Sequence, residues 1–167
     1  MNSLKSFNSK IIQFNVDYWI DFDMENIGIL FENCEDAFKI VTKNDSNKLN
    51  IVKFINLFMQ SKTRMAMENG SPKMLSSNYC RLMTYVIEID LNNNWKILKL
   101  KTNETNDIYK NSLYWVGQTY SYISCRSLIP FRFIHKLLTL EDMEKLFITG
   151  HQLSFEGFYD RIKHKLI

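Results

Sequence analysis

Residues 11–24, IIQFNVDYWIDFDM, decide the fold class that the sequence predicts. Every second residue from Ile12 to Met24 is apolar, and the residues between them are mostly polar or acidic. Successive side chains of a β-strand point to opposite faces, so this alternation predicts a strand with one buried face and one solvated face. The stretch that follows, residues 26–33 (NIGILFEN), is then expected to return as a second strand.

Two later stretches also predict strands. Residues 81–102, RLMTYVIEIDLNNNWKILKLKT, alternate around three asparagines, Asn92 to Asn94, whose side chains tolerate left-handed backbone. This pattern is typical of a β-hairpin. Residues 112–125, SLYWVGQTYSYISC, are rich in aromatic and β-branched side chains and predict another strand, with a helical start near Ile108 as the alternative.

Helices are expected between and after these strands. Residues 33–45 have Asn33 as a candidate N-cap and two acids in the first helical turn. Residues 46–70 carry apolar side chains at helical spacing and end at Gly70, with Pro72 beyond.

The C-terminal quarter is also expected to be helical. Thr139 and Asp142 resemble a capping box with a shortened acid, which starts a helix that runs to about Gly150. Ser154 is expected to cap the last helix, and residues 127–138 remain ambiguous. Taken together, the sequence predicts an α+β single domain over residues 1–167, with a mainly antiparallel sheet of about five strands and about four helices packed on it.

The charge distribution is the strongest non-random feature. Residues 11–38 contain seven acids and no Lys or Arg, although the chain as a whole has 21 basic and 18 acidic residues. The rest of the chain therefore holds all 21 basic residues and 11 acids, a net charge of +10. An acidic N-terminal quarter is attached to a basic body.

On the predicted first strand, Asp17, Trp19, Asp21 and Asp23 share the face opposite the apolar one. An aromatic residue within a charged rim is typical of a protein interface, and carboxylates steer a basic partner toward it. The ordinary alternative is a solvated strand face whose acids balance lysines elsewhere. The residues predicted to bind the partner are Asp17, Trp19, Asp21, Asp23, Glu25, Glu32, Glu35 and Asp36.

A metal-dependent nuclease or nucleotidyl transferase is the alternative hypothesis. Asp21 with Asp23, and Glu88 with Asp90, are carboxylate pairs two residues apart on predicted strands. Four oxygen ligands would converge on Mg²⁺ or Mn²⁺ if the two strands were neighbours. Such short patterns recur by chance, so we expect no metal site and no cofactor.

Direct nucleic-acid binding is not favoured by the sequence. Lys96, Lys99 and Lys101 crowd one predicted strand near Trp95, but lysines are also what edge strands use to avoid aggregation. None of the common nucleic-acid-binding motifs is present.

Three dispersed cysteines and an N-terminus without an apolar signal segment predict a cytoplasmic protein, and no apolar run is long enough for a membrane span. No P-loop, nucleophile elbow or zinc-protease motif occurs, so we expect a binding protein rather than an enzyme. By analogy it is an immunity- or antitoxin-type inhibitor that neutralises a toxin or nuclease by stoichiometric binding.

Overall fold

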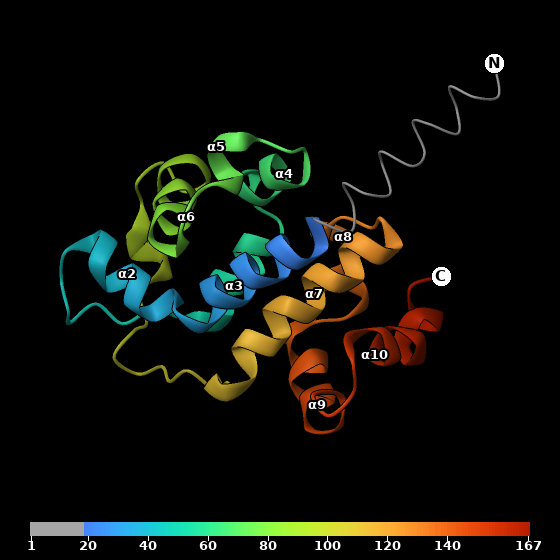
Figure 1. Ribbon diagram of the computed structural model, residues 1–167. Coiled ribbons are helices and arrows are strands. Elements are labelled where there is room, and N and C mark those ends of the chain that lie inside the picture. Colours follow the sequence, from blue (N-terminus) through green and yellow to red (C-terminus); the bar gives the residue numbers. More distant parts are fainter. Residues whose placement is uncertain (1–18) are drawn as a thin grey trace, which may run out of the picture.

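The computed structural model describes residues 19–167, and most of this part of the chain is helical (Figure 1). Helical backbone covers residues 19–32, which we call the first helix. The later α-helices are α2 (Cys34–Thr42), α3 (Ile51–Met59), α4 (Lys62–Glu68), α5 (Pro72–Leu75), α6 (Tyr79–Tyr85), α7 (Leu113–Ser127), α8 (Phe131–Leu137), α9 (Leu140–Gly150) and α10 (Phe155–Ile162). Shorter elements are a π-helical turn, η1 (Val86–Asp90), and the 3₁₀ turns η2 (Trp95–Leu98), η3 (Lys110–Ser112) and η4 (Lys163–Lys165).

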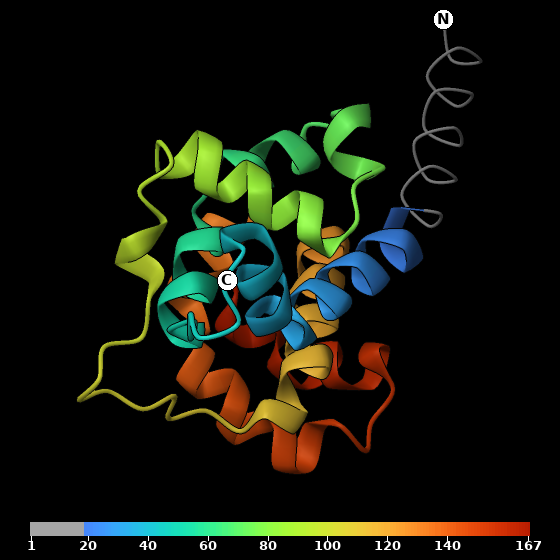
Figure 2. The ribbon, with the colours of Figure 1, turned by 90° about the vertical axis from the view of Figure 1, so that its left-hand side faces the viewer.

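The predicted α+β fold with an antiparallel sheet is wrong. Within residues 19–167 the only β pairing is one isolated antiparallel bridge between Leu49 and Lys99. Helices α4 to α6 form the upper part of the molecule in Figures 1 and 2. The middle consists of the first helix, α2, α3 and α7. Helices α9 and α10 form the lower part. No helix in this described part is both long and apolar enough to cross a bilayer.

The strand predicted over residues 11–24 is wrong where the structure describes it, because residues 19–24 belong to the first helix. Its buried side chains recur at three- and four-residue spacing, at Ile20, Met24, Ile27 and Phe31, which is the period of an amphipathic helix. Phe22, which strict alternation would bury, is 38% exposed. Residues 26–33 are not a returning strand, because they continue the same helix. Residues 11–18 lie outside the described part.

The strand predicted over residues 112–125 is the long helix α7. Ten of its fifteen residues are buried, Gly117 and three small polar side chains among them, so the helix is buried on most sides and has no single apolar stripe. Helices α8, α9 and α10 all contact it. At Gly117 an added Cβ would lie 2.6 Å from the backbone oxygen of Ile27, so α7 and the first helix cross at very short range.

The hairpin predicted over residues 81–102 is also wrong. Helix α6 occupies its first half and continues into the π-helical turn η1. The expected left-handed backbone does occur, at Asn92 (φ 48°) and Asn93 (φ 64°), but it ends a helix rather than joining two strands. The return consists of η2 and the bridge at Lys99.

Several predicted helix ends are confirmed. Gly70 is left-handed (φ 79°) at the end of α4, and Thr139 forms a reciprocal capping box with Asp142 at the start of α9. Ser154 caps α10 by accepting a hydrogen bond from the backbone of Gly157. The helix predicted over residues 46–70 is divided into α3 and α4.

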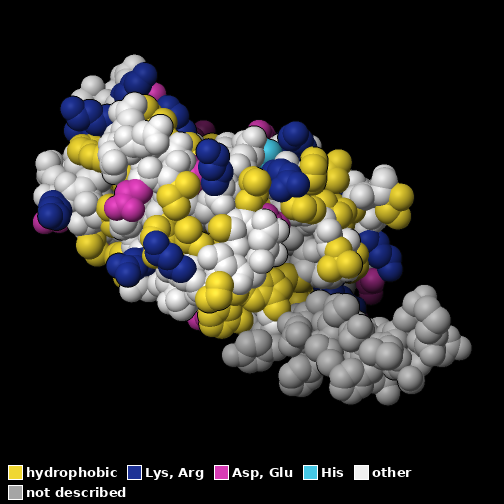
Figure 3. Space-filling view, turned by 90° about the horizontal axis from the view of Figure 1, so that it is seen from above, with side chains coloured by type: hydrophobic (Ala, Val, Ile, Leu, Met, Phe, Trp, Pro, Cys, Tyr) yellow, Lys and Arg dark blue, Asp and Glu magenta, His cyan; other side chains and the backbone are white. Residues whose placement is uncertain are grey.

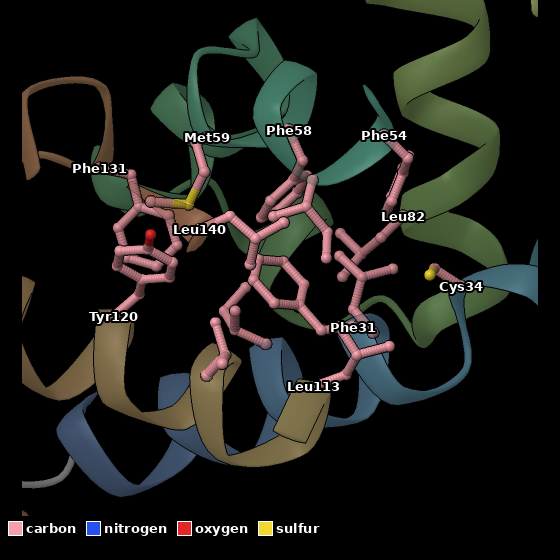
Figure 4. Packing of buried hydrophobic residues seen from close by; sticks show 14 of the residues in the cluster. Phe31, Cys34, Phe54, Phe58, Met59, Leu82, Leu113, Tyr120, Phe131 and Leu140 are labelled. Atoms are coloured by element: carbon pink, nitrogen blue, oxygen red, sulfur yellow. The ribbon is translucent and has the colours of Figure 1, made fainter. Parts of the chain in front are cut away.

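The core lies between α3, α7 and the first helix. Phe58 of α3 contacts Phe54, Phe31 of the first helix and Phe131 of α8, with ring centroids 6.2, 5.9 and 6.5 Å away. Figure 4 shows these side chains pointing toward one another between the helices. Burial of a Phe side chain contributes about 1.5–3 kcal/mol, so this aromatic cluster is a major source of stability.

Candidate protein-binding surface

The outward side of the first helix is acidic. Asp21, Glu25 and Glu32 are exposed and lie four and seven residues apart, which places them on one side of the helix, away from Ile27. Within residues 19–167 none of the three forms an ion pair with Lys, Arg or His. We call these three residues the acidic face.

Asp23 belongs to a buried cluster instead of the acidic face. Its carboxylate accepts two hydrogen bonds from Arg64 of α4, at 2.6 and 2.8 Å, and a third from the hydroxyl of Ser121 of α7. Asp23 and Arg64 are both at most 1% exposed. The helical backbone therefore separates Asp21 from Asp23, which the predicted strand placed side by side.

Burial and charge alter the titration of the groups around this ion pair. Burial alone would lower the pKa of Arg64, but the attraction and hydrogen bonds of Asp23 outweigh burial and raise it. Burial raises the pKa of Glu68 despite the opposing charge of Arg64. Burial, with a smaller contribution from Asp23, also raises the pKa of Cys125 to about 12, so this thiol remains protonated at neutral pH.

A hollow of about 280 Å³ opens beside this cluster. The guanidinium of Arg64 lies 3.6 Å from the ring centre of Phe131, and its Nε has no acceptor among residues 19–167. Arg64 lines the hollow, but its Nε is itself buried, so this atom is a donor without a partner inside the cluster, which is uncommon in folded proteins. The hollow is lined by Trp19, Arg64, Glu68, Asn69, Ser124, Cys125, Leu128, Ile129 and Pro130.

The indole of Trp19 does not stand free in solvent. It is partly buried and packs against a small cluster of Ile20, Met24 and Cys125. Phe22, with its ring centre 6.1 Å away, is the more exposed aromatic side chain of the pair. Figure 3 shows several groups of exposed hydrophobic side chains on the face seen from above.

Leu128 lines the same hollow as Trp19. It is 77% exposed and adopts left-handed backbone (φ 59°) at the C-cap of α7. Glycine usually occupies this conformation because it has no Cβ, and asparagine is tolerated because its short polar side chain forms local hydrogen bonds. An exposed leucine held in a strained turn is a common feature of functional surfaces. We call Trp19, Phe22 and Leu128 the apolar rim.

A tyrosine of α7 holds one carboxylate of the acidic face. The hydroxyl of Tyr114 donates a 2.6 Å hydrogen bond to Glu25. This hydrogen bond, together with burial and the charge of Glu25, raises the pKa of Tyr114 to about 12. Tyr114 thus remains a neutral donor and holds the side chain of Glu25 in position.

The other predicted partner-binding residues lie apart from the acidic face. Glu35 forms an ion pair with Lys110 at 2.7 Å and accepts a hydrogen bond from Asn106 at 3.2 Å. Asp36 is exposed in the first turn of α2. Asp17 lies outside the described residues.

The carboxylates of the metal-site hypothesis serve other purposes. Asp23 pairs with Arg64, and Asp90 caps α4 by accepting hydrogen bonds from the backbone of Lys62 (2.6 Å) and the hydroxyl of Thr63 (2.8 Å). Glu88 is exposed in the π-helical turn. In the part of the chain that the structure describes, no three His, Cys, Asp or Glu side chains come together around a possible metal position.

The most important residues that the sequence analysis missed are Arg64, Ser121, Tyr114 and Leu128. Asp23 falls on the buried side of a helical period that includes Ile20 and Met24, and this pattern could have indicated a buried cation partner. Tyr114 is 89 residues from Glu25, so no local pattern connects the two.

Comparison of the chain with protein-family models, with curated proteins and with solved structures found no match.

Proposed function

We propose that this chain is a protein-binding inhibitor that docks through the acidic face onto a basic surface of a partner protein. The observation that carries the proposal is the row of exposed carboxylates, Asp21, Glu25 and Glu32, without an ion pair in the described part of the chain. Unpaired carboxylates on one rigid helix attract a cationic surface and raise the rate of association.

The apolar rim supports the same proposal. Charged rims around apolar contact residues are typical of interfaces, and aromatic side chains often dominate the binding energy. Phe22 and Leu128 have the exposed area that such contacts need, and the hollow between Trp19 and Leu128 accommodates a side chain of the partner.

The partner class follows by analogy rather than from contacts. Enzymes that cleave nucleic acid bind phosphate through basic clefts, and an acidic helix beside an apolar rim complements such a cleft. We therefore propose a toxin or nuclease as the partner and inhibition as the result of binding. The three free thiols, two of them buried, agree with the proposed cytoplasmic location.

A quantitative capture experiment tests the proposal. The wild-type chain, the variant Asp21→Asn/Glu25→Gln/Glu32→Gln and a control variant are each immobilised and exposed to cytosol from the source organism. The control, Asp45→Asn/Glu88→Gln/Asp107→Asn, removes the same charge from exposed acids that form no ion pair in the described part. Candidate partners are identified by mass spectrometry, then purified and titrated against the chain.

We expect one basic protein that binds one-to-one to the wild type and to the control. Its affinity for the acidic-face variant should be lower by a factor of about 10 or more. Its association rate should fall as salt is added, and its enzymatic activity should be lost at equimolar inhibitor. A partner retained equally by all three proteins, or no one-to-one partner at all, would contradict the proposal.

A further inference from the structure

Lysines from three separate segments meet on one side of the molecule. Lys96, Lys99 and Lys101 come from the segment after α6, whereas Lys53 belongs to α3 and Lys48 precedes it. The antiparallel bridge between Leu49 and Lys99 joins two of these segments. We call the five lysines and Lys39 of α2 the lysine surface.

Two backbone hydrogen bonds fix this arrangement. The backbone carbonyl of Leu98 accepts a 2.8 Å hydrogen bond from the amide of Asn50. The amide of Leu100 donates a 2.7 Å hydrogen bond to the backbone carbonyl of Lys48. Leu98 is fully buried and Leu100 partly buried, while Lys99 and Lys101 are exposed. The bridge therefore anchors the segment through its leucines and directs the lysines into solvent.

The lysine surface is concave. One hollow of about 530 Å³ is lined by four of its members, Lys53, Lys96, Lys99 and Lys101. A second hollow of about 420 Å³ is lined by Lys39 and Lys48. Both hollows include Leu100 and Glu104, so they adjoin and form one extended depression.

Little negative charge offsets these lysines. Glu104 lines both hollows and Glu35 the second, but Glu35 pairs with Lys110 and Glu104 accepts a hydrogen bond from the backbone of Lys101. Within residues 19–167 none of the six lysines forms an ion pair. The first turn of α3, beside Lys53, contains no acid, so the positive end of this helix dipole adds to the field.

We propose that the lysine surface binds the phosphate backbone of nucleic acid without reading its bases. Six unpaired ammonium groups spread over two adjoining hollows match a row of phosphates better than a single anion. Lysine is a point charge without the fork geometry that arginine uses for base edges, and the surface contains no arginine.

The shape and the neighbouring aromatic residue refine this proposal. Trp95 packs against Phe38, with ring centres 5.9 Å apart, and lines neither hollow, so it is not placed to stack with bases bound there. A duplex, which needs phosphate contacts and no stacking, fits this surface better than a single strand. A concave surface also fits the ridge of a phosphate backbone better than the flat headgroup layer of a membrane.

This inference is independent of the proposed inhibitor function. The sequence alone favoured solvated lysines of an edge strand, because only the fold brings Lys48 and Lys53 next to Lys99.

Fluorescence anisotropy with a labelled duplex of about 20 base pairs tests the proposal at about 50 mM salt. The variant Lys48→Glu/Lys99→Glu/Lys101→Glu reverses three charges of the lysine surface. The control, Lys73→Glu/Lys136→Glu/Lys165→Glu, makes the same change in net charge at exposed lysines outside both hollows. Circular dichroism establishes that both variants are folded.

We expect the lysine-surface variant to bind the duplex at least about 30-fold more weakly, and the control less than about threefold more weakly. The slope of log K against log salt should become shallower by about one for each lost contact. Absent binding by the wild type, or equal losses in both variants, would overturn the proposal. If polyglutamate binds as tightly as the duplex or more tightly, the proposal is overturned and the ligand is an acidic protein. If anionic vesicles bind and the duplex does not, the proposal is overturned and the ligand is a membrane.

Discussion

The buried ion pair between Asp23 and Arg64 sets the clearest expectation for a single residue. We predict that Asp23→Ala lowers the free energy of unfolding by about 3–5 kcal/mol, because it leaves the guanidinium of Arg64 buried without a counter-charge. Urea denaturation measures this loss. Asp21→Ala, two residues away and exposed, should change stability by less than about 0.5 kcal/mol.

The double variant Asp23→Leu/Arg64→Met distinguishes the ion pair from general packing. Replacing both charges by apolar side chains removes the uncompensated charge, so the double variant should be more stable than Asp23→Ala. A loss of less than about 1 kcal/mol in Asp23→Ala would contradict this account of the cluster.

Asp142 predicts a pH dependence of stability. Hydrogen bonds from the backbone and the hydroxyl of Thr139 lower the pKa of its carboxyl in the folded state. The stabilisation is therefore fully present above the unfolded pKa of about 3.9 and is lost as the pH falls through the lowered folded value. We predict that Asp142→Asn costs about 1 kcal/mol at neutral pH, because a neutral amide oxygen accepts the hydrogen bonds of the capping box more weakly than a carboxylate does, and progressively less in acid.

Urea denaturation of the wild type and Asp142→Asn between about pH 2 and 7 measures this difference. Glu141→Gln, which removes an exposed acid of the same helical turn, is the control. A cost of Asp142→Asn that stays constant across this range would show that the carboxylate charge does not contribute.

At the scale of the helices, Gly117 tests the crossing of α7 and the first helix. Helix propensity alone predicts that Gly117→Ala stabilises the chain by about 1 kcal/mol. The Cβ would lie 2.6 Å from the backbone oxygen of Ile27, so we predict a net destabilisation of about 1–3 kcal/mol instead. Thermal unfolding measures the sign, and a stabilised variant would show that the helices separate without cost.

The helices also show which parts of this fold could be predicted from the sequence and which could not. The ends at Gly70, Thr139 and Ser154 were predictable, because capping depends on side chains a few residues apart. Helix α7 was not, since a helix buried on most sides has no amphipathic period and its aromatic and β-branched residues favour strands locally. The packing of α8, α9 and α10 around it outweighs that local preference.

The first helix was mispredicted for a different reason. Over residues 20–24 the alternating and the helical patterns both place Ile20 and Met24 on the buried side. Only Ile27 and Phe31, further along, fit the helical period and break the alternation. The acidic face depended on this choice, because a strand places Asp21 beside Asp23 and a helix places it beside Glu25.

For the whole molecule, the fold predicts where backbone amides are protected from hydrogen exchange. Helix α7 lies among the first helix, α8, α9 and α10, so its amides should exchange only through global unfolding. Residues 99–107 are mostly exposed and contain no helix, and they are attached to residues 48–51 by the amide of Leu100, which donates to Lys48, and by the side chain of Asn106, which hydrogen-bonds to Leu49 and Ile51. We predict fast exchange there, measured by mass spectrometry of peptides.

The same measurement separates the two proposed surfaces. If the lysine surface binds a phosphate backbone, added duplex should slow exchange in residues 99–107, because binding restricts the least stable segment. The first helix should keep its exchange rates, since the acidic face repels the ligand. Protection of the first helix by the duplex would instead mean that nucleic acid contacts the apolar rim, and it would contradict the assignment of separate surfaces.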